Sequence, residues 1–69
     1  PEFLTEADDR GMTFLHQLAL AGSYDGVDVC LQHGADPNMP AGNGMKPLAL
    51  AKSLGWNKVI GRLQQAGAI

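Results

Sequence analysis

The 69-residue sequence predicts an all-α fold, a helix-turn-helix solenoid of two repeats with an intervening β-hairpin-like loop. Two observations lead to this prediction. Shifted by 33 residues, the sequence matches itself at seven of the 25 aligned pairs from Gly11/Gly44 to Ala35/Ala68. Ordinary residue frequencies give only about one or two such matches. Within each copy, apolar residues also recur at helical spacing between glycines.

The first predicted helix lies between Thr13 and Gly22. The Thr13 hydroxyl can cap the helix start, and Gly22 ends the helix. The apolar face between them consists of Leu15, Leu18 and Ala19.

The second predicted helix has Asp25 and Asp28 near its start, where the helix dipole favours negative charge. His33 falls in its last turn and Gly34 lies just past its end, the usual place for a terminating glycine. Its apolar stripe consists of Val27, Cys30 and Leu31.

The second copy predicts two further helices. Pro47 takes the first position of one helix, where its missing N–H costs nothing, and Gly55 ends that helix. Asn57 is expected to cap the other helix, which stops at Gly67. Their apolar residues are Leu48, Leu50, Ala51 and Leu54, then Val59, Ile60 and Leu63. The connection at 35–45 is rich in proline and glycine, and Asn43-Gly44 is its hairpin-turn candidate.

Two motifs connect this pattern to a family. The residues at 13–16, Thr-Phe-Leu-His, resemble the T-P-L-H of an ankyrin repeat, and Gly-Ala-Asp-Pro-Asn at 34–38 resembles its G-A-D-x-N ending. The resemblance implies one ankyrin-repeat domain over 4–69, with repeat one at 8–40 and repeat two at 41–68. Repeat two departs from the motif at Lys46, Ala49 and Lys52. Residues 1–3 match what an expression vector leaves after tag removal, so we expect them to lie outside the domain.

Further departures from the family pattern are informative. Gly26 stands where the family prefers Ile or Val, which leaves a cavity or admits a neighbour, and Leu18 stands where Ala is usual. Arg62 and Gln64 replace leucines, and with Gln65 they suggest a polar C-terminal cap, since a terminal repeat has no neighbour to cover it. The alternative is that these three are tolerated substitutions.

The charges divide along the chain. Residues 1–36 carry a net charge of -6 and residues 37–69 a net charge of +4. Stacking the repeats would therefore create an acidic and a basic end, which could steer a partner or pair two copies. Two solvated faces without a partner are the alternative.

Two repeats are few for this architecture, because about three are normally needed to bury a continuous core. We therefore expect either a fragment of a longer protein or a homo- or heterodimer whose second chain supplies the missing face. The expected exposed edge is the N-terminal side of repeat one, covered in part by Leu18, Val27, Cys30 and Leu31.

No catalytic chemistry stands out, and we predict no enzyme, no metal and no cofactor. Cys30-x-x-His33 lacks further ligands nearby, so a buried thiol and a helix-end histidine are preferred. The Gly-Asn-Gly at 42–44 with Lys46 lacks the spacing of a phosphate loop. In the family, the histidine matching His16 has a structural role.

Composition excludes other classes. Five basic against seven acidic residues argue against nucleic-acid binding, and no stretch of about 18 apolar residues spans a membrane. A single cysteine forms no internal disulfide, and no signal peptide begins the sequence. We therefore expect an intracellular, reducing compartment.

The resemblance implies a protein–protein interaction module, an adaptor or scaffold whose partner is another protein. Alternatives are a regulatory appendage of a larger enzyme or channel and an assembly module, for example in organelle protein sorting. Family contacts come from hairpin tips and the inner-helix surface. The matching residues are Asp9, Arg10, Met12, Leu20, Asn43, Met45, Ser53 and Trp56. The alternative for Met12 and Met45 is packing between neighbouring hairpins. Trp56 is either an interface anchor or a ring lying flat on Lys52.

Overall fold

The computed structural model describes residues 6–69, and the predicted vector residues 1–3 lie outside this range. The described residues form four helices: α1 (Phe14–Ala21), α2 (Tyr24–Gln32), α3 (Pro47–Leu54) and α4 (Asn57–Gln65). The bounds of α3 and α4 follow those of α1 and α2 by 33 residues at both ends. The predicted all-α, two-repeat fold is therefore confirmed. Within this part of the chain, no helix has the length and apolarity needed to cross a bilayer.

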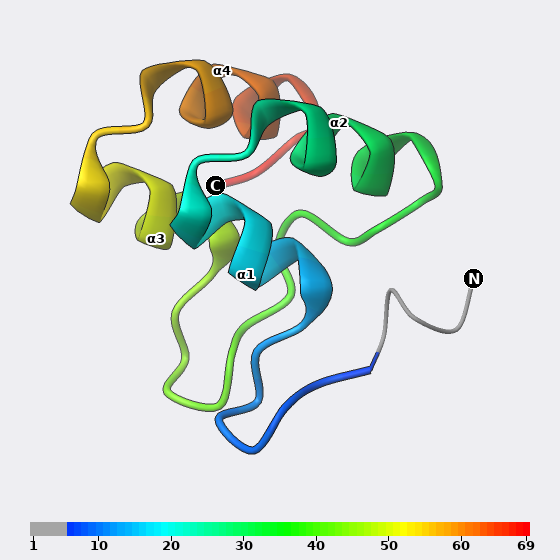
Figure 1. The fold of residues 1–69 in the computed structure, drawn as a ribbon, viewed down its shortest axis with the longest axis vertical. Coiled ribbons are helices and arrows are strands. Elements are labelled where there is room, and N and C mark those ends of the chain that lie inside the picture. The colour runs from blue at the N-terminus through cyan, green and yellow to red at the C-terminus, as the bar shows by residue number, and fades with distance from the viewer. Residues whose placement is uncertain (1–5) are drawn as a thin grey trace.

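The helices form two layers. The first helices of the repeats, α1 and α3, pack side by side, and α2 packs on α4 in the second layer (Figure 1). Within each repeat the two helices are antiparallel, joined by a tight turn (Figure 1). The core lies between the layers and consists of Leu15, Ala19, Val27, Cys30, Ala35, Leu48, Ala51, Val59, Leu63 and Ala68.

The helix ends keep the 33-residue repeat, but not every capping residue is the expected one. Thr13 takes the predicted N-cap position of α1, but its hydroxyl lies 2.7 Å from His16 Nδ1 and makes no side-chain cap bond. Ser23 is the N-cap of α2, where its hydroxyl accepts the Gly26 N–H at 3.3 Å. The expectation that Asn57 caps α4 is wrong, because Trp56 takes the N-cap position and makes no side-chain cap bond. Only Gly55 and Trp56 lie between α3 and α4, and Gly55 is the C-cap of α3, so the N-cap of α4 falls on Trp56.

A short hairpin precedes α3. The Ala41 N–H donates to the Met45 carbonyl at 2.8 Å, and the Gly44 N–H donates back to the Ala41 carbonyl at 2.8 Å. Gly44 ends the loop with φ +83°, a left-handed conformation that favours glycine. Asn43-Gly44 thus lies in a three-residue hairpin loop, where the sequence predicted a turn.

A matching hairpin precedes α1, and the two loops touch through their backbones. The Gly42 N–H donates to the Arg10 carbonyl at 3.0 Å. A Cβ on Gly42 would lie 2.4 Å from the Arg10 oxygen, and one on Gly11 would lie 2.5 Å from the Gly42 nitrogen. Glycine at both positions is therefore required by this close approach.

The space beside Gly26 is filled by a neighbour. A Cβ on Gly26 would lie 2.7 Å from Cδ2 of Leu18, so the larger residue of α1 occupies the room that a β-branched residue of α2 would take. The corresponding residues of repeat two, Ala51 and Val59, are both buried in the core. Of the two possibilities left by the sequence, a cavity or an admitted neighbour, the structure shows the second.

The residues that were expected at the exposed edge of repeat one lie elsewhere. Val27 and Cys30 are 0% and 1% exposed, because they face the interior between the layers, while Leu18 and Leu31 pack against that core. The large apolar residues of α1 and α2 that are exposed there include Phe14 and Val29, at 45% and 49%.

The predicted C-terminal cap is correct in part. Gln64 and Gln65 are exposed, as a polar end requires. Arg62 faces the other way, because its Nε donates to the Asp28 carboxylate of α2 at 2.7 Å. Arg62 thus connects the repeats, and its assignment to the outer face is wrong.

Candidate functional site

The tips of the two hairpins form one surface. Asp9, Arg10 and Asn43 are exposed there. The Arg10–Gly42 backbone bond holds one tip against the other. These three residues line an open depression of about 780 Å³, together with Asp8, Gly11, Met12 and Gly42. Four of the predicted contact residues, Asp9, Arg10, Met12 and Asn43, thus line one depression, and all but Met12 are exposed.

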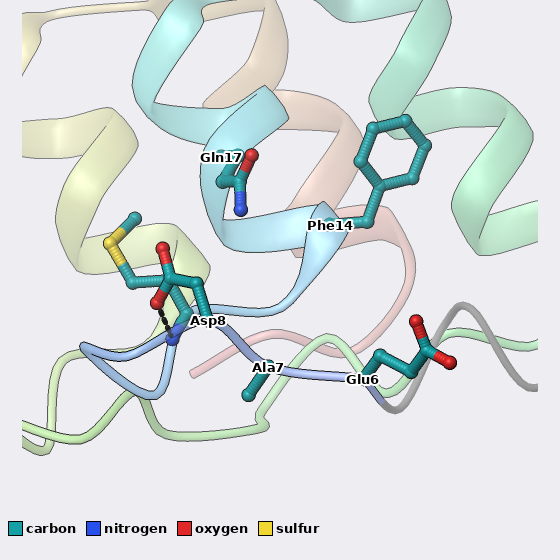
Figure 2. Close-up of a pocket in the computed structure, with 6 residues that line it drawn as sticks. Glu6, Ala7, Asp8, Phe14 and Gln17 are labelled. Atoms are coloured by element: carbon teal, nitrogen blue, oxygen red, sulfur yellow. Dashed lines mark hydrogen bonds between the residues drawn. The ribbon is translucent and has the colours of Figure 1, made fainter.

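Asp8 organises the first tip, a role that the sequence analysis missed. Its Oδ1 accepts the N–H groups of Arg10 and Met12 at 2.9 and 3.0 Å, and Oδ2 lies 3.4 Å from the Arg10 guanidinium. Figure 2 shows the bond between the carboxylate and the backbone. The Met12 N–H, assisted by Arg10, lowers the pKa of Asp8 below its ordinary value of 3.8. An aspartate three residues before Gly11 is the signal that indicates such a turn.

The second tip has one comparable side-chain bond to the backbone. The Asn43 side-chain oxygen accepts the Met45 N–H at 3.0 Å. The amide that orders the loop is uncharged, whereas the carboxylate in repeat one is charged. The tip surface therefore joins an ionic turn to a neutral one.

The two methionines were expected to contact a partner, but they pack against other residues of the protein instead. Met12 is only 8% exposed and forms a small apolar cluster with Ala41 and Leu50 beneath the hairpins, against which the half-buried Met45 packs. Leu50 of repeat two faces repeat one, so side chains of both repeats fill the space between the hairpins. Met12 is therefore a packing residue.

The remaining predicted residues lie where the helices turn, at the end of the molecule away from the hairpins (Figure 1). The Trp56 indole Nε1–H donates to the Leu20 carbonyl at 2.9 Å. A Cβ on Gly22 would lie 2.5 Å from the indole ring, so the ring packs closely over Gly22. Ser53 is exposed, and its hydroxyl donates to the Leu50 carbonyl at 2.8 Å.

His16 is fully buried and orders the start of α1. Its Nδ1 accepts the Thr13 N–H at 3.0 Å and lies 2.7 Å from the Thr13 hydroxyl. The structural role implied by the resemblance is therefore observed within repeat one. Repeat two has Ala49 at this position and lacks the bond.

Cys30 and His33, the two residues considered as metal ligands, have surroundings typical of structural residues. Burial raises the pKa of the Cys30 thiol, which favours the neutral, unreactive form. The ring of His33 bonds to the Val29 carbonyl at 2.9 Å. Among residues 6–69, no three or more His, Cys, Asp or Glu side chains are grouped as a metal site requires.

A second depression of about 420 Å³ lies on the N-terminal side of α1, between that helix and the segment 6–8 (Figure 2). Gln17 lines it at the position that Leu50 holds in repeat two. Leu50 is buried against repeat one, whereas Gln17 is exposed. This polar residue gives the N-terminal side a partial cap.

Fold and surface together define a stacked-helix repeat protein with exposed loop tips. Comparison with known proteins identifies the repeat: the family model described as ankyrin repeat matches residues 10–39. The chain is 35% identical over 63 residues to a putative ankyrin repeat protein of Neisseria meningitidis serogroup B, covering 91% of this chain and 25% of the relative. It is 39% identical over 59 residues to the ARF GTPase-activating protein Git of Drosophila melanogaster, covering 86% of this chain and 8% of the relative.

The comparisons thus show an ankyrin repeat at residues 10–39 of this chain. Asn38, from the G-A-D-x-N motif, shows what that family pattern does here. Its side chain donates to the Gly67 carbonyl at 3.2 Å and accepts the Ile69 N–H at 3.0 Å, so it ties the loop after repeat one to the end of repeat two. The ankyrin repeat is a protein–protein interaction module, and the chain spans a quarter or less of the length of these two relatives.

Proposed function

We propose that this chain acts as a non-catalytic adaptor or scaffold module whose protein partner docks on the hairpin tips. The observation that carries the proposal is the backbone bond between Arg10 and Gly42, which joins the two tips into one surface before any partner arrives. A preorganised surface loses little conformational freedom on binding, so more of the contact free energy appears as affinity.

The exposed side chains on this surface have mixed character. Asp9 and Arg10 carry opposite charges, and Asn43 adds a neutral amide. Such a combination supports recognition of polar groups on a folded partner. The buried cluster of Met12 and Leu50 supports the surface from below.

Immobilised wild-type chain and tip variants test the proposal through capture of a partner from cell extract. Arg10→Glu and Asn43→Lys each change the tip surface without entering the core, although Asn43→Lys also removes the bond to the Met45 N–H, so circular dichroism of each variant checks the fold. Gln65→Lys is the control substitution on exposed α4. We expect each tip variant to retain at least about tenfold less partner, as hot-spot substitutions do, and the Gln65 control to match wild type. Equal capture by all four proteins would exclude the tips as the docking surface.

A second candidate, a regulatory appendage of a larger protein, is favoured by the lengths of the relatives. The matching segment makes up only 8% of the fly GTPase-activating protein and 25% of the bacterial protein. In this case the partner of the tips is another domain of the same polypeptide. Comparing the full-length protein with a version lacking this segment, in any assay of the larger protein, distinguishes the two candidates.

A further inference from the structure

The helix-turn end of the molecule carries a second exposed surface, distinct from the hairpin tips. We define it by Leu20, Leu54 and Trp56, together with Lys52 in the last turn of α3 and Lys58 in the first turn of α4. The three large apolar residues are 37%, 51% and 40% exposed, respectively. Helices α1 and α3 pack side by side and end at the same side of the molecule, which brings their C-terminal ends to one side (Figure 1). The bond from the Trp56 indole to the Leu20 carbonyl connects two of the three apolar residues across the repeats.

A small pocket opens at this end. It has a volume of about 230 Å³, and its lining includes the Trp56 and Tyr24 side chains and two glycines, Gly22 and Gly55. Both glycines end helices with φ +74°, and they leave the pocket without side chains of their own. The one charged residue in its lining is Lys58. The pocket has room for one apolar side chain beside an ammonium group.

The charge of this surface is unbalanced. Residues 37–69 contain no acidic side chain, and the four basic residues of this half are Lys46, Lys52, Lys58 and Arg62. Arg62 is paired with Asp28, whereas the three lysines have no ion pair within the described residues. Asp25 shares an adjoining groove with Lys58 without pairing with it. Lys52 and Lys58 are therefore available to carboxylates of a partner.

We propose that this helix-turn surface binds an acidic peptide segment whose apolar side chain enters the pocket beside Trp56. The lysines pair with carboxylates that flank the apolar residue, and the exposed leucines cover its surroundings. The proposal rests on the proposed interaction function and names a second, chemically defined partner for it. Because Trp56 is the single tryptophan of the chain, its fluorescence reports occupancy directly.

Selection of short peptides from a random displayed library on the 69-residue chain tests this assignment. We expect the selected peptides to be enriched in Asp and Glu next to Leu or Phe, and a synthetic copy of one to shift the Trp56 emission. The double variant Lys52→Glu, Lys58→Glu should weaken its binding at least about tenfold, equivalent to about 1.4 kcal/mol. Added salt should weaken it as well, since exposed charges are screened.

Lys46→Glu is the matched control, because it makes the same kind of charge reversal at the hairpin end of α3, outside the pocket. It should bind the peptide within about twofold of wild type, because charges more than about 10 Å apart are largely screened at moderate salt. Circular dichroism of each variant separates loss of binding from loss of fold. Trp56→Phe, which keeps an aromatic ring, should also bind more weakly.

Six results overturn the inference. The first two are a selection that yields no binders and one whose binders lack acidic bias. The next two are peptides that leave Trp56 emission unchanged and peptides that respond to Lys46→Glu as strongly as to the double variant. Peptides that bind but depend on Arg10 and Asn43 would remove this inference while supporting the tip proposal. Salt-sensitive self-association of the chain that the double variant abolishes would assign the surface to a second copy instead.

Discussion

Equivalent positions of the two repeats have different surroundings, and the glycines show this most clearly. Gly11 and Gly44 both have positive φ, at +73° and +83°. A Cβ on Gly11 would meet the backbone of repeat two, whereas one on Gly44 would meet no atom within 4 Å. Gly22 and Gly55 differ in the same way, because the indole of Trp56 lies over the first alone.

The difference teaches that one residue type can be required for two separate reasons. In both repeats the left-handed backbone favours glycine. In repeat one, the following repeat also approaches so closely that a side chain has no room. Repeat two has no described neighbour on that side, so conformation alone restricts its glycines.

Exchanging these glycines tests that distinction and has the largest expected effect on stability. Gly11→Ala should lower the free energy of unfolding by about 3 kcal/mol, through backbone strain together with steric overlap. Gly44→Ala should lower it by only about 1–2 kcal/mol, through strain alone. Urea unfolding followed by circular dichroism measures both. Equal losses would show that crowding between the hairpins contributes nothing.

The paired residues Leu18–Gly26 and Ala51–Val59 extend the comparison to the core. Each pair supplies four side-chain carbon atoms, but the large residue belongs to the first helix in repeat one and to the second helix in repeat two. Gly26→Val should destabilise the protein by about 1–3 kcal/mol, because Leu18 already fills the space. The double variant Leu18→Ala, Gly26→Val recreates the pair of repeat two and should recover most of that loss.

Thermal unfolding of the two single variants and the double variant provides the coupling energy. For residues in contact we expect about 0.5–3 kcal/mol of favourable coupling. Additive effects of the two substitutions would contradict the volume exchange between the helices.

The ion pair between Asp28 and Arg62 has the smallest expected effect. Arg62→Gln should cost about 0.2–1 kcal/mol of stability, because both side chains are partly exposed to water. Added salt should reduce the difference from wild type. Gln64→Ala serves as the control on the exposed face, and a loss as large as that of Arg62→Gln would show that the contact with repeat one is not what matters.

Local signals in the sequence identified much of the fold. The 33-residue period, the glycines at helix ends and Pro47 predicted four helices in the observed order, since these signals depend on backbone conformation close to each residue. The direction of a side chain was harder to predict. Arg62 was expected on the outer face and faces Asp28 instead, and Val27 was expected at an edge and lies in the core.

The candidate site divides in the same manner. Asp9, Arg10 and Asn43 were expected at loop tips and are exposed there, because turn residues and polarity are readable locally. Met12 was expected beside them and is buried, since its exposure depends on Leu50 from the other repeat. The role of Asp8 was missed because its carboxylate accepts hydrogen bonds from backbone N–H groups, which the residue pattern does not display.

The amino-acid sequence by itself determined the period, the helices and the ankyrin character of this chain, because propensities, caps and turn glycines act within a few residues. Tertiary structure alone decided which tip residues remain exposed, how Trp56 joins the two repeats, and which lysines are left without a partner. Those outcomes depend on contacts between residues more than 30 positions apart in the sequence. A local sequence pattern does not predict such contacts.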